Sequence, residues 1–234
     1  MRLPLWMRGL FPLTATKDEI RAILARFKLT TDKSRFCALV SRWDITGVRA
    51  EIYRAVSAIA PVAAAGRVLH NDDSLQTQFG DDKTRYLRQF QFNICPENSA
   101  GDGYVTEKIW QAFAAGCIPI YAGYSRDPEP EILNPQAFLW WTVGSRPQTG
   151  GDNAALLTEI RALRNDEKLY RAFAARPIFL DTAVDKIHGY LQAGAEALRE
   201  VVEKQLRTCP IINERRPDRD EMSVEKATRK KSVP

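Results

Sequence analysis

The sequence predicts an α/β protein built on a doubly wound parallel sheet. Short apolar segments with strand-like patterns alternate with longer segments whose apolar residues recur at helical spacing. The stretch 90–123 reads FQFNICPENSAGDGYVTEKIWQAFAAGCIPIYAG, which is a strand, a polar loop, a helix and a strand in that order. The composition, 44% hydrophobic and 27% charged over 234 residues, is that of an ordinary globular protein. A parallel sheet with crossing helices is the architecture that accommodates this order.

The first ninety residues supply two strands and two helices. Thr16 and Glu19 form a capping-box pattern, and the apolar residues behind them predict a structural helix. Buried strands are expected at 36–41 and around 61–62, with a helix at 48–59 between them. The polar stretch that follows, at 71–82, predicts a loop or a short helix.

The stretch 90–123 supplies the centre of the sheet. Apolar and polar residues alternate at 90–95, as in a strand, and a loop rich in glycine and polar residues follows. Helical spacing predicts a helix at 105–115, and Gly116 stands where a left-handed residue would end it. The next strand is expected at 118–121. Such a unit directs a helix N-terminus toward a ligand, and helix N-termini attract anions.

The remainder of the chain is mostly helical. A strand is expected at 138–142, then a loop at 145–152, and helices at 153–164, 166–175 and 182–206. The final segment carries charges of both signs and few large apolar residues, so we expect it to be disordered.

Two cations stand early in predicted helices that follow strands. Arg49 follows the 36–41 strand and comes three residues after Thr46, a candidate N-cap. Lys108 lies in the first turn of the 105–115 helix. The helix dipole disfavours a cation there unless an anion sits beside it. Ligands of doubly wound sheets lie beyond the carboxyl ends of the strands, so the two cations are expected to converge on a diphosphate. The alternative is two unrelated surface charges.

Several segments together resemble a known enzyme family. They are PENS, GYVTEKIWQAFAAGCIPIYAG, Arg35–Ser41, Tyr86–Phe90 and the run from Asn134 to Phe138. These segments are similar to those of the alpha-1,3/4-fucosyltransferases, glycosyltransferase family 10, over about residues 33–142. The resemblance implies the Rossmann-like C-terminal half of a GT-B glycosyltransferase. It also implies GDP-fucose as donor, with inverting transfer of fucose to a glycan that contains N-acetylglucosamine or glucose.

The resemblance also implies roles for particular residues. Arg49 and Lys108 resemble the phosphate-contacting cations, and Glu107 the carboxylate that binds hydroxyls of the donor sugar. Glu97 and Asn98 match a Glu-Asn pair, whose carboxylate would hold fucose hydroxyls or stabilise positive charge on the sugar. Glu97, Arg49 and Lys108 are therefore the catalytic candidates. For Glu107 and Asn98 the alternatives are a favourable helix-dipole position and an ordinary turn residue.

The loop adds one aromatic candidate and contains a departure from the family pattern. Tyr104 would stack on the base or close the site, and its alternative is simple packing. Gly103 and Gly123 would allow close approach of the backbone. The family has aromatic residues at two positions that are occupied here by Pro96 and Ala122, which is expected to alter the walls of the donor pocket.

The predicted domain limits follow from the same resemblance. Residues 1–32 would be a remnant or linker, 33–206 the GDP-fucose-binding domain, and 207–234 a charged disordered tail. About 32 residues cannot form the acceptor-binding lobe that carries the family's general base, because a domain needs roughly 100 residues. A complete transferase would need that lobe. The alternatives are an enzyme of the same fold that uses another nucleotide sugar, and a catalytically incomplete binding module.

Composition narrows the partners and the cofactors. The formal net charge of +5 fits an anionic ligand or peripheral contact with a membrane, but no basic stripe interleaved with aromatics indicates nucleic acid. The cysteines and histidines lack metal-ligand spacing, so no metal is expected and no cofactor besides the donor. They are Cys37, Cys95, Cys117, Cys209, His70 and His188. Reduced thiols suit a protein in the bacterial cytoplasm or on the cytoplasmic membrane face. For a eukaryotic member of the family we expect the Golgi membrane instead. No feature of the sequence indicates an oligomeric state.

Overall fold

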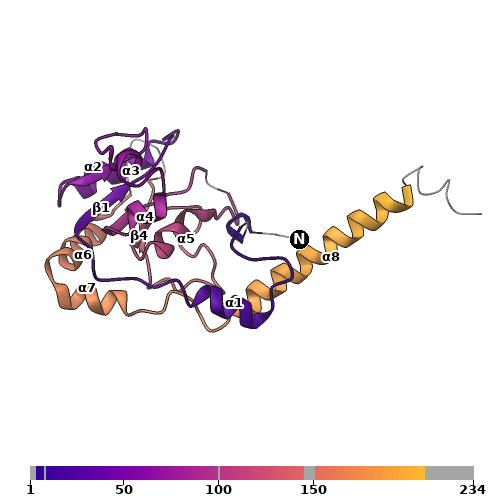
Figure 1. Cartoon of the computed structure of the whole chain (residues 1–234). Coiled ribbons are helices and arrows are strands. Elements are labelled where there is room, and N and C mark those ends of the chain that lie inside the picture. Colours follow the sequence, from indigo (N-terminus) through magenta and orange to yellow (C-terminus); the bar gives the residue numbers. More distant parts are fainter. Residues whose placement is uncertain (1–3, 8, 100, 145–150, 209–234) are drawn as a thin grey trace, which may run out of the picture. The chain divides into compact units, whose positions relative to one another are not determined.

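A five-stranded parallel sheet is the centre of the computed structural model (Figure 1). The structure describes residues 4–7, 9–99, 101–144 and 151–208, and the chain divides into compact units at 1–191 and 192–234. The strands are β1 Arg35–Leu39, β2 Val62–Ala64, β3 Phe90–Ile94, β4 Ile118–Tyr121 and β5 Leu139–Trp140. All five lie near their predicted positions, which confirms the α/β fold class.

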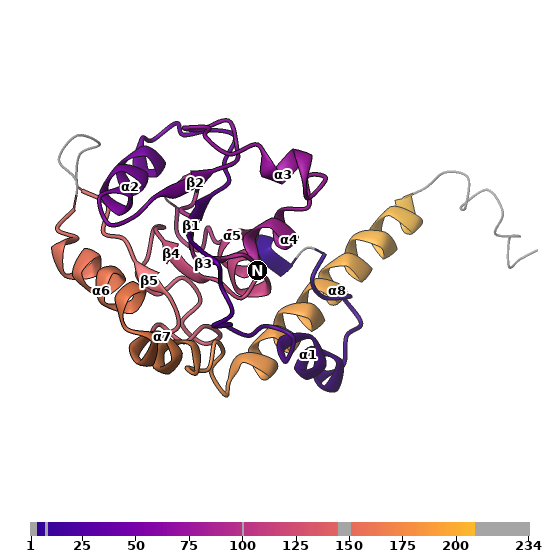
Figure 2. The same cartoon turned by 60° about the vertical axis from the view of Figure 1, so that its left-hand side comes forward.

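The strand order β2-β1-β3-β4-β5 makes the sheet doubly wound. From β1 the chain moves outward to β2, and from β3 it moves in the opposite direction to β4. Parallel crossovers are right-handed, so the helices of these two connections cover opposite faces of the sheet. Figure 2 shows α2 Val48–Ser57 on one side of the strands and α5 Glu107–Ala114 on the other. The direction of winding reverses between β1 and β3, and a ligand crevice is expected at their carboxyl ends.

The remaining helices agree with the sequence patterns, except that the 3₁₀ helix η1 Leu5–Met7 and helix α4 Lys83–Leu87 are additions that were not predicted. The others are α1 Lys17–Leu24, α3 Ser74–Thr77, α6 Ala154–Asn165, α7 Glu167–Ala174 and α8 Ala183–Thr208. Helix α5 begins later than expected because Thr106, its N-cap, has an extended backbone.

Two local predictions about helix ends are confirmed. Thr16 and Glu19 form both hydrogen bonds of a capping box at the start of α1. Gly116 follows α5 with φ of 73°, the left-handed conformation expected at that position. A Cβ on Gly116 would also lie only 2.5 Å from Oγ1 of Thr30, so both conformation and space require glycine there.

The described part of segment 1–32 packs into the core of the sheet unit. Trp6 is fully buried and stacks on Trp110 of α5 with ring centroids 4.1 Å apart. Its indole Nε1 donates a hydrogen bond of 2.7 Å to the buried carboxylate of Glu129. Burial of an aromatic side chain of this size stabilises the fold by a few kcal/mol. These contacts join the segment physically to the sheet, whereas the domain limits themselves stay a prediction.

Helix α8 ends at Thr208, close to the predicted end at residue 206. The tail predicted to be disordered, 207–234, lies outside the described residues apart from its first two, and so does most of the predicted loop at 145–152. No helix in the described part of the chain is both long and apolar enough to span a membrane.

Candidate functional site

The residues predicted to bind a ligand gather beyond the carboxyl ends of β1 and β3. A cavity of about 200 Å³ lies there, at the point where the winding of the sheet reverses. We call it the cation cavity. Its lining consists of residues 40–43 after β1, residues 94–96 at the end of β3, and Arg49, Lys83, Asn98, Glu107 and Lys108. The two predicted phosphate-binding cations thus line one cavity, and each is the second residue of its helix.

Lys108 is held in place by groups from the loop before its helix. Its ammonium donates hydrogen bonds to Oε2 of Glu97 at 3.2 Å and to Oγ1 of Thr106 at 2.8 Å. Oε1 of Glu107 lies 3.8 Å from the same nitrogen, although the Glu107 side chain is 56% exposed. The lysine is therefore fixed at the edge of the cavity before any ligand arrives.

Glu97 is a buried carboxylate that receives four hydrogen bonds. Oε1 accepts from the backbone N–H of Thr106 at 2.8 Å and from the hydroxyl of Tyr121 at 3.1 Å. Oε2 accepts from the hydroxyl of Thr106 at 2.6 Å and from Lys108. Burial and the charge of Glu97 raise the pKa of Tyr121, so its hydroxyl stays protonated and donates. This carboxylate ties together β4, the loop after β3 and the start of α5, and both its oxygens are occupied.

Gly123 makes room for the Tyr121 contact. A Cβ at position 123 would lie 2.9 Å from the hydroxyl oxygen of Tyr121 and 3.2 Å from its ring. Any larger residue would displace the hydroxyl from Glu97. The close approach predicted for Gly123 is thus toward a neighbouring side chain of this protein.

Arg49 is buried in the wall of the cation cavity. Its Nη2 donates to the backbone carbonyl of Pro96 at 2.9 Å and to Oδ1 of Asn98 at 2.7 Å. Burial lowers the pKa of Arg49, although a guanidinium remains charged at any physiological pH. Arg49 therefore fixes the Glu-Asn loop and the Asn98 amide, in addition to presenting positive charge.

Asp44, which the sequence reasoning missed, caps helix α2. Its carboxylate accepts from the backbone N–H groups of Arg49 at 3.1 Å and of Ala50 at 2.9 Å. The prediction that Thr46 caps this helix is wrong, because the N-cap is Gly47 in the left-handed conformation and makes no side-chain cap. Since Asp44 already accepts from the backbone N–H groups of Arg49 and Ala50, these two groups are not free to bind a ligand.

Lys83, also missed, is a further cation in the lining, beside Arg42, Arg49 and Lys108. It is the first residue of α4, and its ammonium donates to Oε1 of Gln111 on α5 at 2.8 Å. Like Arg49 and Lys108, Lys83 lies at the start of a helix, and this position is the sequence feature that could have identified it as a ligand-binding cation. It was overlooked because α4 itself was not predicted.

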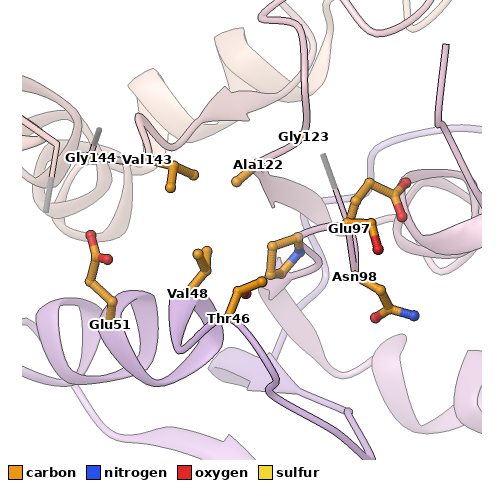
Figure 3. Close-up of a pocket in the computed structure, with 11 residues that line it drawn as sticks. Thr46, Val48, Glu51, Glu97, Asn98, Ala122, Gly123, Val143 and Gly144 are labelled. Atoms are coloured by element: carbon orange, nitrogen blue, oxygen red, sulfur yellow. The ribbon is translucent and has the colours of Figure 1, made fainter. Parts of the chain in front are cut away.

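A second cavity, of about 220 Å³, is lined in part by the Pro96–Asn98 segment. We call it the apolar cavity, and Figure 3 shows Val48 and Thr46 on one wall and Val143 and Ala122 on the opposite one. Glu51 stands at one end of it, and Glu97 and Asn98 at the other. Pro96 and Ala122, the two positions where the family has aromatic residues, both line this cavity. Pro96 and Asn98 line both cavities.

A third cavity is the largest of the three. It has a volume of about 680 Å³ and shares Val40, Ser41 and Arg42 with the cation cavity. Tyr104, the predicted base-stacking residue, is half-buried and lies in the lining of none of the three cavities.

The cysteines and acidic residues show no metal-binding arrangement in the part of the chain that the structure describes. No group of three histidine, cysteine, aspartate or glutamate side chains is placed there to hold an ion. Cys37, Cys95 and Cys117 are buried free thiols, and burial raises the pKa of Cys117 to about 12. These thiols are neutral core residues.

Comparisons with known proteins point to the same family. Residues 29–176 match the model for the C-terminal part of glycosyltransferase family 10 (fucosyltransferase). The alpha-(1,3)-fucosyltransferase FucT of Helicobacter pylori is 34% identical over 110 residues, which cover 46% of this chain and 21% of that protein. Alpha-(1,3)-fucosyltransferase B of Drosophila melanogaster is 29% identical over 145 residues, covering 58% of this chain and 31% of that protein.

A solved structure adds agreement in three dimensions. A crystal structure of alpha1,3-fucosyltransferase with GDP-fucose superposes with a TM-score of 0.54 at 25% identity, over 70% of this chain and 48% of that chain. The chain thus spans between about a fifth and a third of the length of these curated relatives, and about half of the solved one. On the family match and the shared fold, this chain belongs to glycosyltransferase family 10, the fucosyltransferases.

Proposed function

We propose that this chain binds GDP-fucose and forms the donor half of an alpha-1,3-fucosyltransferase. The observation that carries the proposal is the convergence of Arg49 and Lys108, from two different helices, on one cavity at the switch point of the sheet. A diphosphate needs such a concentration of positive charge. The solved relative that contains GDP-fucose supports the choice of donor.

The three cavities suggest how the donor lies. The diphosphate occupies the cation cavity between Arg49 and Lys108, and the nucleoside extends into the large cavity beside Arg42. The sugar lies toward the apolar cavity, where Asn98 presents an amide. Because both oxygens of Glu97 are already hydrogen-bonded, Glu97 acts in this arrangement as the residue that positions Lys108. Glu107, exposed at the edge of the cation cavity and only loosely paired with Lys108, reaches toward sugar hydroxyls.

The chemistry follows from this arrangement. The acceptor hydroxyl oxygen forms a bond to C1 of fucose while the bond from C1 to the phosphate oxygen breaks, which inverts the configuration at C1. Arg49 and Lys108 stabilise the negative charge that develops on the departing GDP, without need of a metal. A general base takes the proton of the acceptor hydroxyl. We place this base, and the binding of the N-acetylglucosamine- or glucose-containing acceptor, in an acceptor lobe that acts together with this chain.

Nucleotide binding tests the proposal directly. GDP bound only by the native state should stabilise it by about 2.7 kcal/mol at 100 times Kd, which raises the Tm. UDP and CDP should raise the Tm less, and Lys108→Met should remove most of the GDP effect. Arg54 is an exposed arginine on the same helix as Arg49, so Arg54→Ala is the control and should respond to GDP like the wild type. Equal Tm shifts with all three nucleotides would contradict the guanine specificity, and no shift with GDP would contradict the function.

Transfer is a separate measurement. With GDP-fucose and N-acetyllactosamine, the chain alone should bind the donor but form little fucosylated product, because general-base catalysis contributes roughly 10² to 10⁴-fold. Adding an acceptor lobe from a family member, fused or as a separate chain, should increase product formation. Rapid transfer by the chain alone would show that the general base lies among its own residues.

A further inference from the structure

Lys83 places a cation beside the proposed phosphate site without any carboxylate partner among the described residues. Its ammonium donates to the neutral amide oxygen of Gln111, and no ion pair joins it to another side chain in that part of the protein. It nevertheless lines the same cavity as Arg49 and Lys108. Four cations, Arg42, Arg49, Lys83 and Lys108, line this small cavity with a single carboxylate, Glu107, so positive charge is in excess there. An anion in the cavity would balance this charge.

The charged groups around Lys83 are more often cations than carboxylates. Arg49 on α2 and Lys108 on α5 disfavour its charge, and Glu107 on α5 favours it without forming an ion pair. The Cys95 thiol after β3 is neutral, because burial raises its pKa. Burial in turn lowers the pKa of Lys83. The nearest fixed charges therefore do not account for a lysine at this position.

Lys33 is a lysine of this fold whose hydrogen bonds only join parts of the structure to one another. It also has a pKa lowered by burial, but its ammonium donates to the backbone carbonyls of Arg88 at 2.9 Å and Ala115 at 2.8 Å. It thus ties α4 and the end of α5 to the chain before β1, and it does not line the cation cavity. Lys83, with one neutral side-chain acceptor and a place in the cavity wall, lacks this structural explanation.

We propose that Lys83 is a third phosphate-binding residue, which holds the diphosphate of the nucleotide sugar together with Lys108 and Arg49. The inference rests on the proposed function and extends it to a residue on α4. A nucleoside diphosphate carries one more negative charge than a monophosphate when both are fully ionised. Lys83 should therefore favour GDP over GMP.

Binding of GDP and GMP to Lys83→Met tests this role. A hydrogen bond between charged groups contributes enough that its loss should raise the Kd for GDP about tenfold or more. The Kd for GMP should rise less, so the preference for GDP over GMP should narrow. Lys83→Arg keeps the charge and should retain most of the preference. If Lys83→Met does not fold, Lys83→Gln provides the same measurement with a neutral side chain.

Lys33→Met is the matched control. It should lower the Tm of the free protein because two carbonyls lose their partner, but it should leave the Kd for GDP unchanged. Unchanged GDP affinity in Lys83→Met would overturn the inference. So would a loss of GDP and GMP affinity by the same factor, which is the result expected if Lys83 only supports the local structure.

Proton uptake gives an independent readout. A bound phosphate favours the charged ammonium, so it should raise the lowered pKa of Lys83 and draw a proton from solution. Calorimetry in buffers of different ionisation enthalpy, below the ordinary lysine pKa of about 10.4, should show more proton uptake on GDP binding for the wild type than for Lys83→Met. Equal uptake would contradict the inference.

The two proposals fail differently. If the wild type binds no GDP, the proposed function itself is wrong. A second outcome is that the wild type binds GDP, Lys108→Met loses GDP binding and Lys83→Met retains it. In that case the proposed function stands and only the role of Lys83 is wrong.

Discussion

The two junctions where a strand enters a helix at the cation cavity are built from the same parts in different ways. After β1, the loop leads to α2 with Arg49 as its second residue, and after β3 the loop leads to α5 with Lys108 as its second residue. Each junction has a carboxylate near the helix start, Asp44 in the first and Glu97 in the second. The difference lies in what each carboxylate joins.

Asp44 acts within its own junction. It accepts from two backbone N–H groups of α2, and its distance of 3.9 Å from Nη1 of Arg49 makes a loose ion pair. Glu97 acts across the fold, since one of its four donors is Tyr121 at the end of the next strand. The first junction is therefore a helix cap, whereas the second is a polar cluster that sets the spacing between β3, β4 and α5.

This difference suggests that the two junctions have different roles in binding the donor. The β3–α5 junction fixes Lys108 through Glu97 and Thr106, so its cation is preorganised for the phosphate. At the β1–α2 junction Arg49 reaches across to Asn98, and so orders the loop of the other junction. Substitutions in the two junctions should therefore differ in both stability and binding.

The largest effect is expected for Glu97→Ala. It removes the acceptor of four hydrogen bonds and leaves Lys108 half-buried without its carboxylate partner. Breaking a buried ion pair in this way costs about 3–5 kcal/mol. Urea unfolding should show a correspondingly lower free energy of unfolding, and the remaining folded protein should bind GDP weakly. A loss below about 1 kcal/mol would mean that the cluster does not support the fold.

The sequence predicted the second junction better than the first, for physical reasons. The strand, loop, helix and strand of 90–121 have strong periodicity, and both strand positions and the role of Gly116 were found. The features of this junction that the sequence did not predict are contacts between residues far apart in the chain. The reach of Tyr121 to Glu97, and of Arg49 to Asn98, spans 24 and 49 positions, and no local pattern encodes such contacts.

The first junction was predicted less well, because its helix cap lies in a short, irregular segment. Thr46 was chosen as the cap because threonine is a good N-cap residue, but a left-handed Gly47 begins α2 and Asp44 reaches past it to the N–H groups. Lys83 was missed because α4 is only five residues long, too short for apolar periodicity to be visible. Short elements and loop reversals are thus the parts of this site that the sequence does not predict.

A middle effect is expected for Tyr121→Phe. It removes one of the four hydrogen bonds to Glu97 and leaves the ring packed in place, so the loss should be about 1.5–3 kcal/mol, as for a hydrogen bond to a charged group. Tyr170→Phe is the matched control, because the Tyr170 hydroxyl donates to the neutral carbonyl of Thr30 at 3.1 Å, and it should cost about 1 kcal/mol. Free energies of unfolding from urea titrations compare the two. A larger loss in the control would reject the special role of the Glu97 cluster.

The smallest effect is expected for Asp44→Ala. This substitution should lower the free energy of unfolding but raise the affinity for GDP. Loss of the cap of α2 should cost about 1 kcal/mol, within the range for N-cap replacements. Asp166→Ala is the matched control, since Asp166 caps α7 through two backbone N–H groups and lies in the lining of none of the three cavities, so it should cost a similar amount.

GDP affinity then separates the two aspartates. Asp44 is a negative charge beside Arg49, and it competes with a phosphate for that guanidinium. Its removal should strengthen GDP binding by about fivefold or more, because a charge pair about 4 Å apart contributes about 1 kcal/mol in bulk water and more where burial reduces the screening. Asp166→Ala should leave GDP affinity unchanged. If Asp44→Ala instead weakens GDP binding strongly, the cap of α2 is needed to hold Arg49 in position, and the two junctions are more alike than their hydrogen bonds indicate.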